Sequence, residues 1–213
     1  AGTLEVGPAG TVEVDGRVKV WPTGTLRMYD GAPVGGRVKC DTLELAPGCT
    51  LDSHLGSSFY VNALEGDVGN LSISGNMYFG YDGGSGVGAH TVGAGQSLSA
   101  NYSAAGYSAP ATLTIENGGV VTTTSDFFIG CLGQGSVNLS GGGSLLDVDD
   151  VLHVGYAHVG SLMVSGGADV ISDEGQMGHF SGSNGTATLS DSGTTWTNAT
   201  WLRIGENGPG QVT

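Results

Sequence analysis

The chain has 213 residues and a formal net charge of −14, and only 12% of its residues are charged. This charge repels the phosphate backbone of nucleic acids and an anionic lipid surface, which argues against both as partners. No apolar stretch is long enough to cross a bilayer as a helix, so we expect no membrane insertion by this segment. The 41 glycines accompany 38% hydrophobic residues, which is enough for a continuous narrow core.

Residues 1–52 predict short β-rungs. The run TLEV at 3–6 recurs as TLEL at 42–45, and RVKV at 17–20 recurs as RVKC at 37–40. Apolar and charged residues alternate in each run, so one face is buried and the other is wet. Four basic residues are expected to form a stripe that either meets an acidic glycan or a neighbouring subunit, or balances acids on adjacent coils, the reading we favour. The bases are Arg17, Lys19, Arg37 and Lys39, and the acids are Glu5, Glu13 and Glu44.

Residues 53–80 predict irregular coils, and residues 81–110 interrupt the pattern as a lateral loop or a degenerate coil. Insertions in solenoids often form loops on the binding face. Tyr81, Tyr102 and Tyr107 stand among small residues there. Aromatic rings in such a setting suit stacking on sugars, so these three tyrosines are the candidate binding residues. The other reading, a tolerated surface loop, is the one we favour.

Residues 111–213 consist of regular repeats with a period of about 25 residues, which is typical of solenoids. Each opening strand follows the previous one at an almost constant interval, and the strands begin at Thr112, Ser136, Ser161, Thr186 and Gln211. Apolar residues alternate in three short runs per repeat. Glycines lie at the corners, where tight turns need positive φ.

These features predict an all-β fold, a right-handed parallel β-helix (β-solenoid) with about three short strands per coil. Equivalent residues of successive coils should stack about 4.8 Å apart. We expect one β-solenoid over residues 1–213. Because the chain opens directly in strand pattern and stops within a repeat, we expect it to be a fragment of a longer protein.

The repeats resemble those of a known group of surface proteins. The segments LHVG at 152–155 and SLMVSGG at 161–167 are similar to the repeats of bacterial autotransporter passengers and of PEP-CTERM-associated surface proteins. The resemblance covers residues 112–213 and part of 70–80. It implies a β-solenoid exported to the bacterial cell surface or the extracellular space, and it specifies no activity.

The expected function is structural: a stalk, spacer or adhesive passenger without enzymatic activity, in contact with glycans or other surface proteins. One alternative is a subunit of a surface filament or layer that associates end to end. The other is a polysaccharide hydrolase or lyase, since β-helix enzymes mostly act on polysaccharides and hydrolysis needs paired carboxylates. Its fallback catalytic residues are Asp149, Asp150, His179 and Arg203.

A cluster of acids is the candidate metal site. Asp149 and Glu174 are separated by one repeat, so we expect them to stack in adjacent coils. Ca²⁺ takes several carboxylate and carbonyl oxygens at such a corner. The other reading, a solvated acidic ridge, is the one we favour. The candidate Ca²⁺ ligands are Asp147, Asp149, Asp150, Asp173 and Glu174.

The three cysteines, Cys40, Cys49 and Cys131, do not form a disulfide framework. Cys40 and Cys49 can bridge if they lie on neighbouring coils. We favour unpaired structural thiols, and no spacing indicates zinc.

Overall fold

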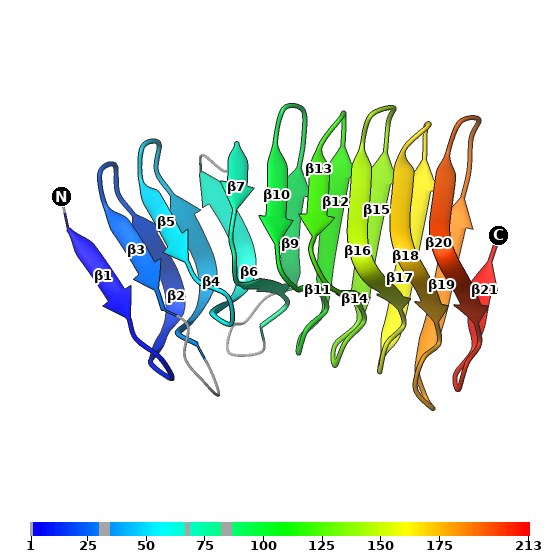
Figure 1. Ribbon diagram of the computed structural model, residues 1–213, viewed down its shortest axis with the longest axis horizontal. Helices are drawn as coiled ribbons and strands as arrows, with labels where there is room; N and C mark the ends of the chain where they lie inside the picture. Colours follow the sequence, from blue (N-terminus) through cyan, green and yellow to red (C-terminus); the bar gives the residue numbers. More distant parts are fainter. Residues whose placement is uncertain (1, 30–34, 67–68, 82–86) are drawn as a thin grey trace.

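The computed structural model describes residues 2–29, 35–66, 69–81 and 87–213. Every regular element in these ranges is a β-strand, and every strand pairing is parallel. Figure 1 shows the strands side by side along the long axis, with the N-terminus at one end and the C-terminus at the other. The predicted parallel β-solenoid is therefore confirmed. Within the described ranges, no helix is long and apolar enough to cross a membrane.

One six-stranded sheet forms the first wall of the solenoid, which we call ladder 1. It contains the opening strands of the repeats, stacked with Thr112 beside Ser136 and Ser136 beside Ser161. The predicted repeat starts are thus confirmed. In stacking order the strands are β9 (Gly88–Val92), β12 (Ala111–Glu116), β15 (Gly135–Ser140), β17 (Val159–Ser165), β19 (Asn184–Leu189) and β21 (Gly210–Val212).

The other two walls, ladders 2 and 3, belong to one twelve-stranded sheet. Ladder 2 contains β7 (Asn70–Ser72), β10 (Ser97–Ala100) and β13 (Val120–Thr123). Ladder 3 contains β8 (Asn76–Phe79), β11 (Ser103–Ala105) and β14 (Phe127–Ile129). In the last coils one long strand serves both ladders and bends at a register shift: β16 (Leu145–Val154), β18 (Asp169–Met177) and β20 (Thr195–Ile204).

The N-terminal coils bend at a different corner. Strands β1 (Thr3–Val6), β3 (Thr25–Met28) and β5 (Thr50–Ser53) form a separate three-stranded sheet. The long strands β2 (Thr11–Val20), β4 (Arg37–Leu45) and β6 (Ser58–Gly66) stack beside one another. Because the first half of β6 pairs with β8, these strands continue ladder 3 toward the N-terminus.

The core is a narrow column of inward side chains. Along ladder 3, Val38 stacks beside Phe59, Phe59 beside Met77, and Phe127 beside Leu152. All five are fully buried. Burying such a side chain contributes about 1.5–3 kcal/mol, so the apolar columns and the ladder hydrogen bonds together hold the coils.

The register of residues 1–52 differs from the sequence expectation. Thr3 pairs with Thr25 and Thr25 with Thr50, while Arg17 pairs with Thr42. The four basic residues therefore do not form one stripe. Lys39 lies beside Glu13, and Lys19 beside Glu44, so the expected balance of opposite charges on adjacent coils is confirmed for these two acids. Glu5 instead pairs with Arg27.

Residues 97–105 form strands β10 and β11 in register with the coils on both sides. The lateral loop is therefore not the arrangement of these residues. Together with β9, they make a complete coil, whose sequence departs from the repeat because small residues replace the usual apolar ones. Residues 82–86 lie outside the described residues.

The three cysteines are thiols. Cys40 points into the core of ladder 3, where burial raises the pKa of its thiol to about 11. Burial raises the pKa of Cys131 to about 11 as well. A disulfide between Cys40 and Cys49 is not formed.

Candidate binding face

The outer surface of ladder 3 carries a band of aromatic side chains. Strand residues alternate in direction, so the outward residues of stacked strands form a row along the solenoid, here called the outer row. Its members are Lys39, Tyr60, Tyr78, Ala104, Phe128, His153, Gln176 and Arg203.

A second row lies beside the first, at the turn that follows ladder 3. From β8 onward, a glycine with positive φ closes each ladder 3 strand, for example 80° at Gly106 and 73° at Gly155. Glycine adopts this conformation without steric cost. The residue after each closing glycine joins this turn row. The turn row contains Tyr81, Tyr107, Cys131, Tyr156, His179 and Glu206. The outer row and turn row together make up the aromatic face.

Three tyrosines form the first cluster of the aromatic face, here called the tyrosine cluster. Tyr78 stacks on Tyr107 with ring centroids 4.5 Å apart, and Tyr60 lies 5.1 Å from Tyr78 and 5.2 Å from Tyr107. Burial raises the pKa of Tyr107 to about 12 and also raises the pKa of Tyr78. Tyr78 and Tyr107 therefore present neutral hydroxyl groups at any physiological pH.

A shallow cavity of about 320 Å³ opens beside this cluster and is here called the tyrosine pocket. One wall of the pocket is the buried side chain of Tyr81, whose hydroxyl donates a hydrogen bond to Glu13. The ammonium of Lys39 lies 5.4 Å from the centre of the Tyr81 ring. The lining residues are Arg37, Lys39, Tyr60, Tyr81, Tyr107 and Ser108.

The second cluster, here called the histidine cluster, contains Phe128, His153, Tyr156, His179 and Phe180. His153 stacks on Phe128 at 4.8 Å, and Tyr156 stacks on His179 at 5.1 Å. Each imidazole also faces a carboxylate. His153 Nε2 lies 3.8 Å from Asp126 Oδ2, and His179 Nδ1 lies 2.8 Å from Glu206 Oε2.

The acidic residues gather at the bend between ladders 2 and 3, but not as the sequence predicted. Glu174 pairs with Val151, not with Asp149, because the register shift in β16 places Asp149 and Asp150 in a bulge. Partial burial, followed by the nearby charges of Asp126, Asp173 and Glu174, raises the pKa of Asp150.

The acids of the expected metal set have other neighbours than predicted. Asp147 pairs with Ile171, and Glu174 forms an ion pair with Arg203 at 3.4 Å. In the part of the chain that the structure describes, no group of three or more His, Cys, Asp or Glu side chains has an arrangement that could hold a metal ion. The predicted stacking of Asp149 on Glu174 is therefore wrong.

The four fallback catalytic residues are not brought into one groove. Asp149 and Asp150 lie in the bulge that precedes ladder 3, whereas His179 lies in the turn that follows it. His179 is bonded to Glu206, and the Arg203 guanidinium is paired with Glu174 and lies 5.8 Å from the Trp201 ring centre.

The predicted tyrosine site is brought together in part. Tyr81 and Tyr107 both line the tyrosine pocket, whereas Tyr102 lies at the opposite end of β11. There its backbone N–H donates to Asn76 Oδ1 at 3.3 Å. Tyr60 and Tyr78 complete the site and were missed, although their outward positions in alternating runs were a usable signal. Arg37 was expected in the basic stripe, and the structure places it in the pocket instead.

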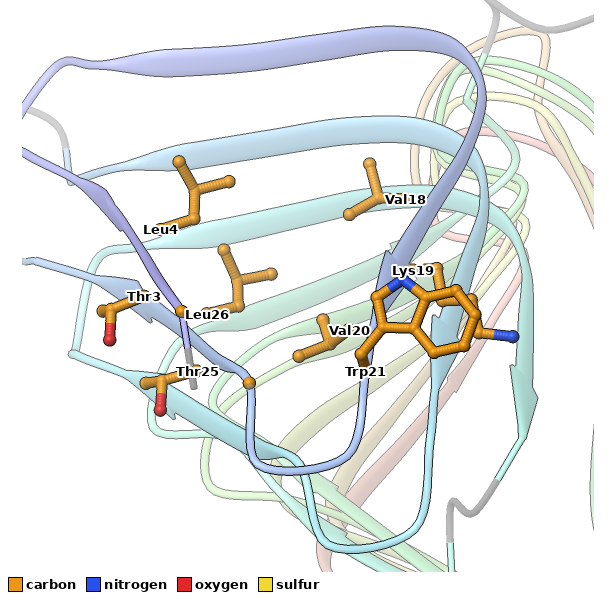
Figure 2. Close-up of a pocket in the computed structure, with 10 residues that line it drawn as sticks. Thr3, Leu4, Val18, Lys19, Val20, Trp21, Thr25 and Leu26 are labelled. Atoms are coloured by element: carbon orange, nitrogen blue, oxygen red, sulfur yellow. The ribbon is translucent and has the colours of Figure 1, made fainter.

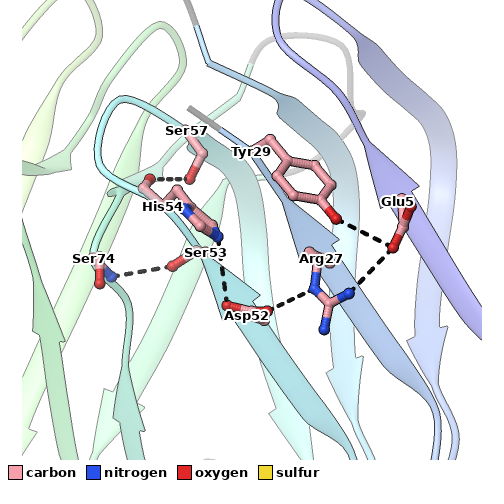
Figure 3. A network of polar contacts seen from close by, with 8 residues as sticks. All are labelled: Glu5, Arg27, Tyr29, Asp52, Ser53, His54, Ser57 and Ser74. Atoms are coloured by element: carbon pink, nitrogen blue, oxygen red, sulfur yellow. Dashed lines mark hydrogen bonds and ion pairs between the residues drawn. The ribbon is translucent and has the colours of Figure 1, made fainter. Parts of the chain in front are cut away.

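Outside the aromatic face, charged residues reinforce the stacking of coils. Figure 3 shows Arg27 between Glu5 and Asp52, on three successive strands of the N-terminal sheet. The Arg27 Nη1–Glu5 Oε1 distance is 3.2 Å, and the Arg27 Nε–Asp52 Oδ2 distance is 2.7 Å. Tyr29 also donates to Glu5 at 3.2 Å.

An apolar cavity of about 320 Å³ lies at the N-terminal end of the solenoid. Figure 2 shows Leu4, Leu26, Val18 and Val20 around it, with Trp21 at its edge. These side chains belong to the first coils, and Leu4 and Leu26 stack in the core register. The cavity is thus the place where the apolar core column is open at the first described coil.

Three comparisons with known proteins gave no match: no family model, no curated protein and no solved structure matches this chain. The resemblance to autotransporter passengers and PEP-CTERM-associated proteins therefore stays a prediction.

Proposed function

We propose that the chain is a structural, adhesive segment of a bacterial surface protein, which acts as a stalk or spacer and offers its aromatic face to glycans or other surface proteins. The observation that carries this proposal is the outer row, which runs in register along ladder 3, although neighbouring side chains cover Ala104, His153 and Gln176. Aromatic side chains recur along it from Tyr60 to His153.

The fold suits a spacer because each coil contacts chiefly its neighbours, so length can be added without changing the cross-section. The aromatic face suits adhesion because flat rings with polar edges stack on sugar rings and take hydrogen bonds at their rims. Successive coils are about 4.8 Å apart. A ligand chain that runs along the solenoid can therefore contact one coil after another.

The test is incubation with a panel of acidic and neutral polysaccharides, with and without Ca²⁺, scoring both bound polysaccharide and newly formed chain ends. Binding without cleavage supports an adhesive segment. If the chain neither binds nor cleaves any polysaccharide, a stalk or spacer without adhesion remains the proposed function. New chain ends would overturn the structural proposal. An effect of Ca²⁺ on binding would support the calcium site expected at the acidic bend.

A polysaccharide-active enzyme is the second candidate, and one observation favours it. The raised pKa of Asp150 beside Asp126, Asp173 and Glu174 is the kind of perturbation that general acids have. New chain ends that disappear in Asp150→Asn, while the variant still folds, would establish this activity.

A further inference from the structure

Arg37 differs from the other basic residues of the chain. Arg17, Lys19, Arg27, Lys39 and Arg203 each form an ion pair with at least one carboxylate. Arg37 forms none within the described ranges. Its neighbours on the adjacent strands are uncharged, Thr11 on β2 and Ser58 on β6. With respect to the described residues, this half-buried guanidinium thus keeps its charge-assisted donors available.

This guanidinium lines the tyrosine pocket. Tyr60 and Tyr107 stand on the same cavity wall, and the positive charge of Arg37 acts on the Tyr107 hydroxyl, where it opposes the rise of the Tyr107 pKa. Ser108 adds a hydroxyl at the rim. The pocket therefore joins aromatic rings and hydroxyl groups to a cation that forms no ion pair with any described residue.

We propose that the tyrosine pocket binds a carboxylate-bearing sugar, a uronic acid unit of a glycan. Arg37 takes the carboxylate in a bidentate pair, because its planar fork of N–H donors matches a carboxylate. Tyr60 and Tyr107 pack against the ring, and the hydroxyl of Ser108 bonds sugar hydroxyl groups. This inference rests on the proposed adhesive role and names the ligand class of one site on the aromatic face.

The charge distribution limits the ligand to a short stretch of acidic sugars. Residues 1–50 hold five bases and six acids, whereas residues 51–213 hold fourteen acids and one base. A long polyanion laid along the whole solenoid is repelled by the C-terminal coils. The C-terminal part of the aromatic face therefore suits neutral sugars, and the Arg37 end suits an acidic unit.

The experiment is a nuclear magnetic resonance titration of the whole chain with trigalacturonate and with its methyl ester, which has the same shape without the charges. We expect the acid to shift the amide signals around Arg37 and Tyr107. The ester should bind about tenfold more weakly, the loss typical of one charge-assisted hydrogen-bond pair. Arg37→Gln should weaken the binding of trigalacturonate by a similar factor and leave the affinity for the ester unchanged.

Arg17→Gln is the matched control, because Arg17 is already paired with Glu44 and does not line the pocket. It should bind trigalacturonate as the original chain does. Equal affinity for acid and ester overturns the inference even if Arg37→Gln does not fold. Binding of inorganic sulfate as tight as that of trigalacturonate also overturns it, since the site would then be a general anion site. If trigalacturonate does not bind at all, this inference is wrong, but the proposed role as a stalk or spacer remains. If trigalacturonate is cleaved, the proposed function itself is wrong.

Discussion

At the scale of single residues, close backbone approach decides which positions must be glycine. Gly160, the second residue of β17, lies against Gly155, the glycine that closes the preceding strand. A Cβ placed on it would overlap the Gly155 nitrogen and the Ile129 carbonyl oxygen, both of them backbone atoms that cannot rotate away. The corner thus packs two chain segments with no room for a side chain.

Gly160→Ala should therefore destabilise the protein by about 1–3 kcal/mol, the usual cost of overpacking. The check is urea unfolding followed by circular dichroism. Gly142→Ala is the matched control, because a Cβ there meets no atom within 4 Å and the residue does not have positive φ. Equal midpoints for the two variants would mean that the corner can relax around the added methyl group.

His90 makes folding sensitive to acid. The ring is buried and stacks on Phe79 at 5.4 Å, and burial lowers its pKa from 6.5 to about 4. Between these pH values His90 is protonated in the unfolded chain and neutral in the folded chain. The free energy of unfolding therefore falls as the pH drops from about 6.5 to about 4. The loss should be about 3 kcal/mol.

His90→Leu removes this proton uptake and keeps the position apolar. We expect the original chain to lose more stability than the variant between pH 7.5 and pH 4.5, measured by urea midpoints at both values. Carboxylates that titrate in the same range contribute equally to both proteins, so the difference isolates His90. An identical loss in both proteins would show that His90 is already protonated when folded.

At the scale of strands, the regular repeats were predictable and the N-terminal register was not. Residues 112–213 keep one spacing, so alternation and glycine position fix the stacking of Thr112 on Ser136. Near the N-terminus the coils are unequal, because the chain length from Thr3 to Thr25 is shorter than that from Thr25 to Thr50. Similar runs there belong to different ladders, which the sequence alone does not reveal.

The same irregular spacing hid most of the candidate site. Lys39, Tyr60 and Tyr78 become neighbours across two coils that are both shorter than the later repeats and differ from each other in length. Only the stacking of unequal coils brings them beside Tyr107. Likewise the bulge in β16 moves Asp149 away from Glu174, although their separation along the chain matches the repeat.

The Arg27 network ties three strands of the N-terminal sheet together. Arg27→Gln removes both ion pairs and leaves Glu5 and Asp52 without their shared cation. Because these groups are partly exposed, we expect a smaller loss of stability than for Gly160→Ala. The loss should shrink in about 1 M NaCl, where the Debye length is only about 3 Å.

Thermal unfolding at low and high salt measures this effect. Arg37→Gln is the control within the same coils, because Arg37 forms no ion pair in the described part of the chain, and its midpoint should hardly change. A loss in Arg27→Gln that persists at high salt would assign the role of Arg27 to packing of its alkyl chain instead of to charge.

At the scale of the whole molecule, the coils of ladder 1 are interchangeable. Strands β12, β15, β17 and β19 present the same alternation of buried and outward residues, and each pairs with the next in register. In such an array, stability is close to a sum of coil and interface contributions. One coil can therefore be removed without disturbing the remainder.

Deletion of residues 136–160 joins Gly135 to Ser161, which places Leu162 and Val164 in the core positions of Val137 and Leu139. We expect a folded chain with the same circular dichroism signature per residue and a modestly lower urea midpoint, since one interface is lost. Deletion of residues 137–160 is the control. It sets Ser161 beside Leu113 and turns Leu162 outward, because a shift of one residue exchanges the two faces of a strand. That chain should lose far more stability or fail to fold. Similar stability of the two deletions would show that the turns absorb the shift and that register is not what holds the solenoid together.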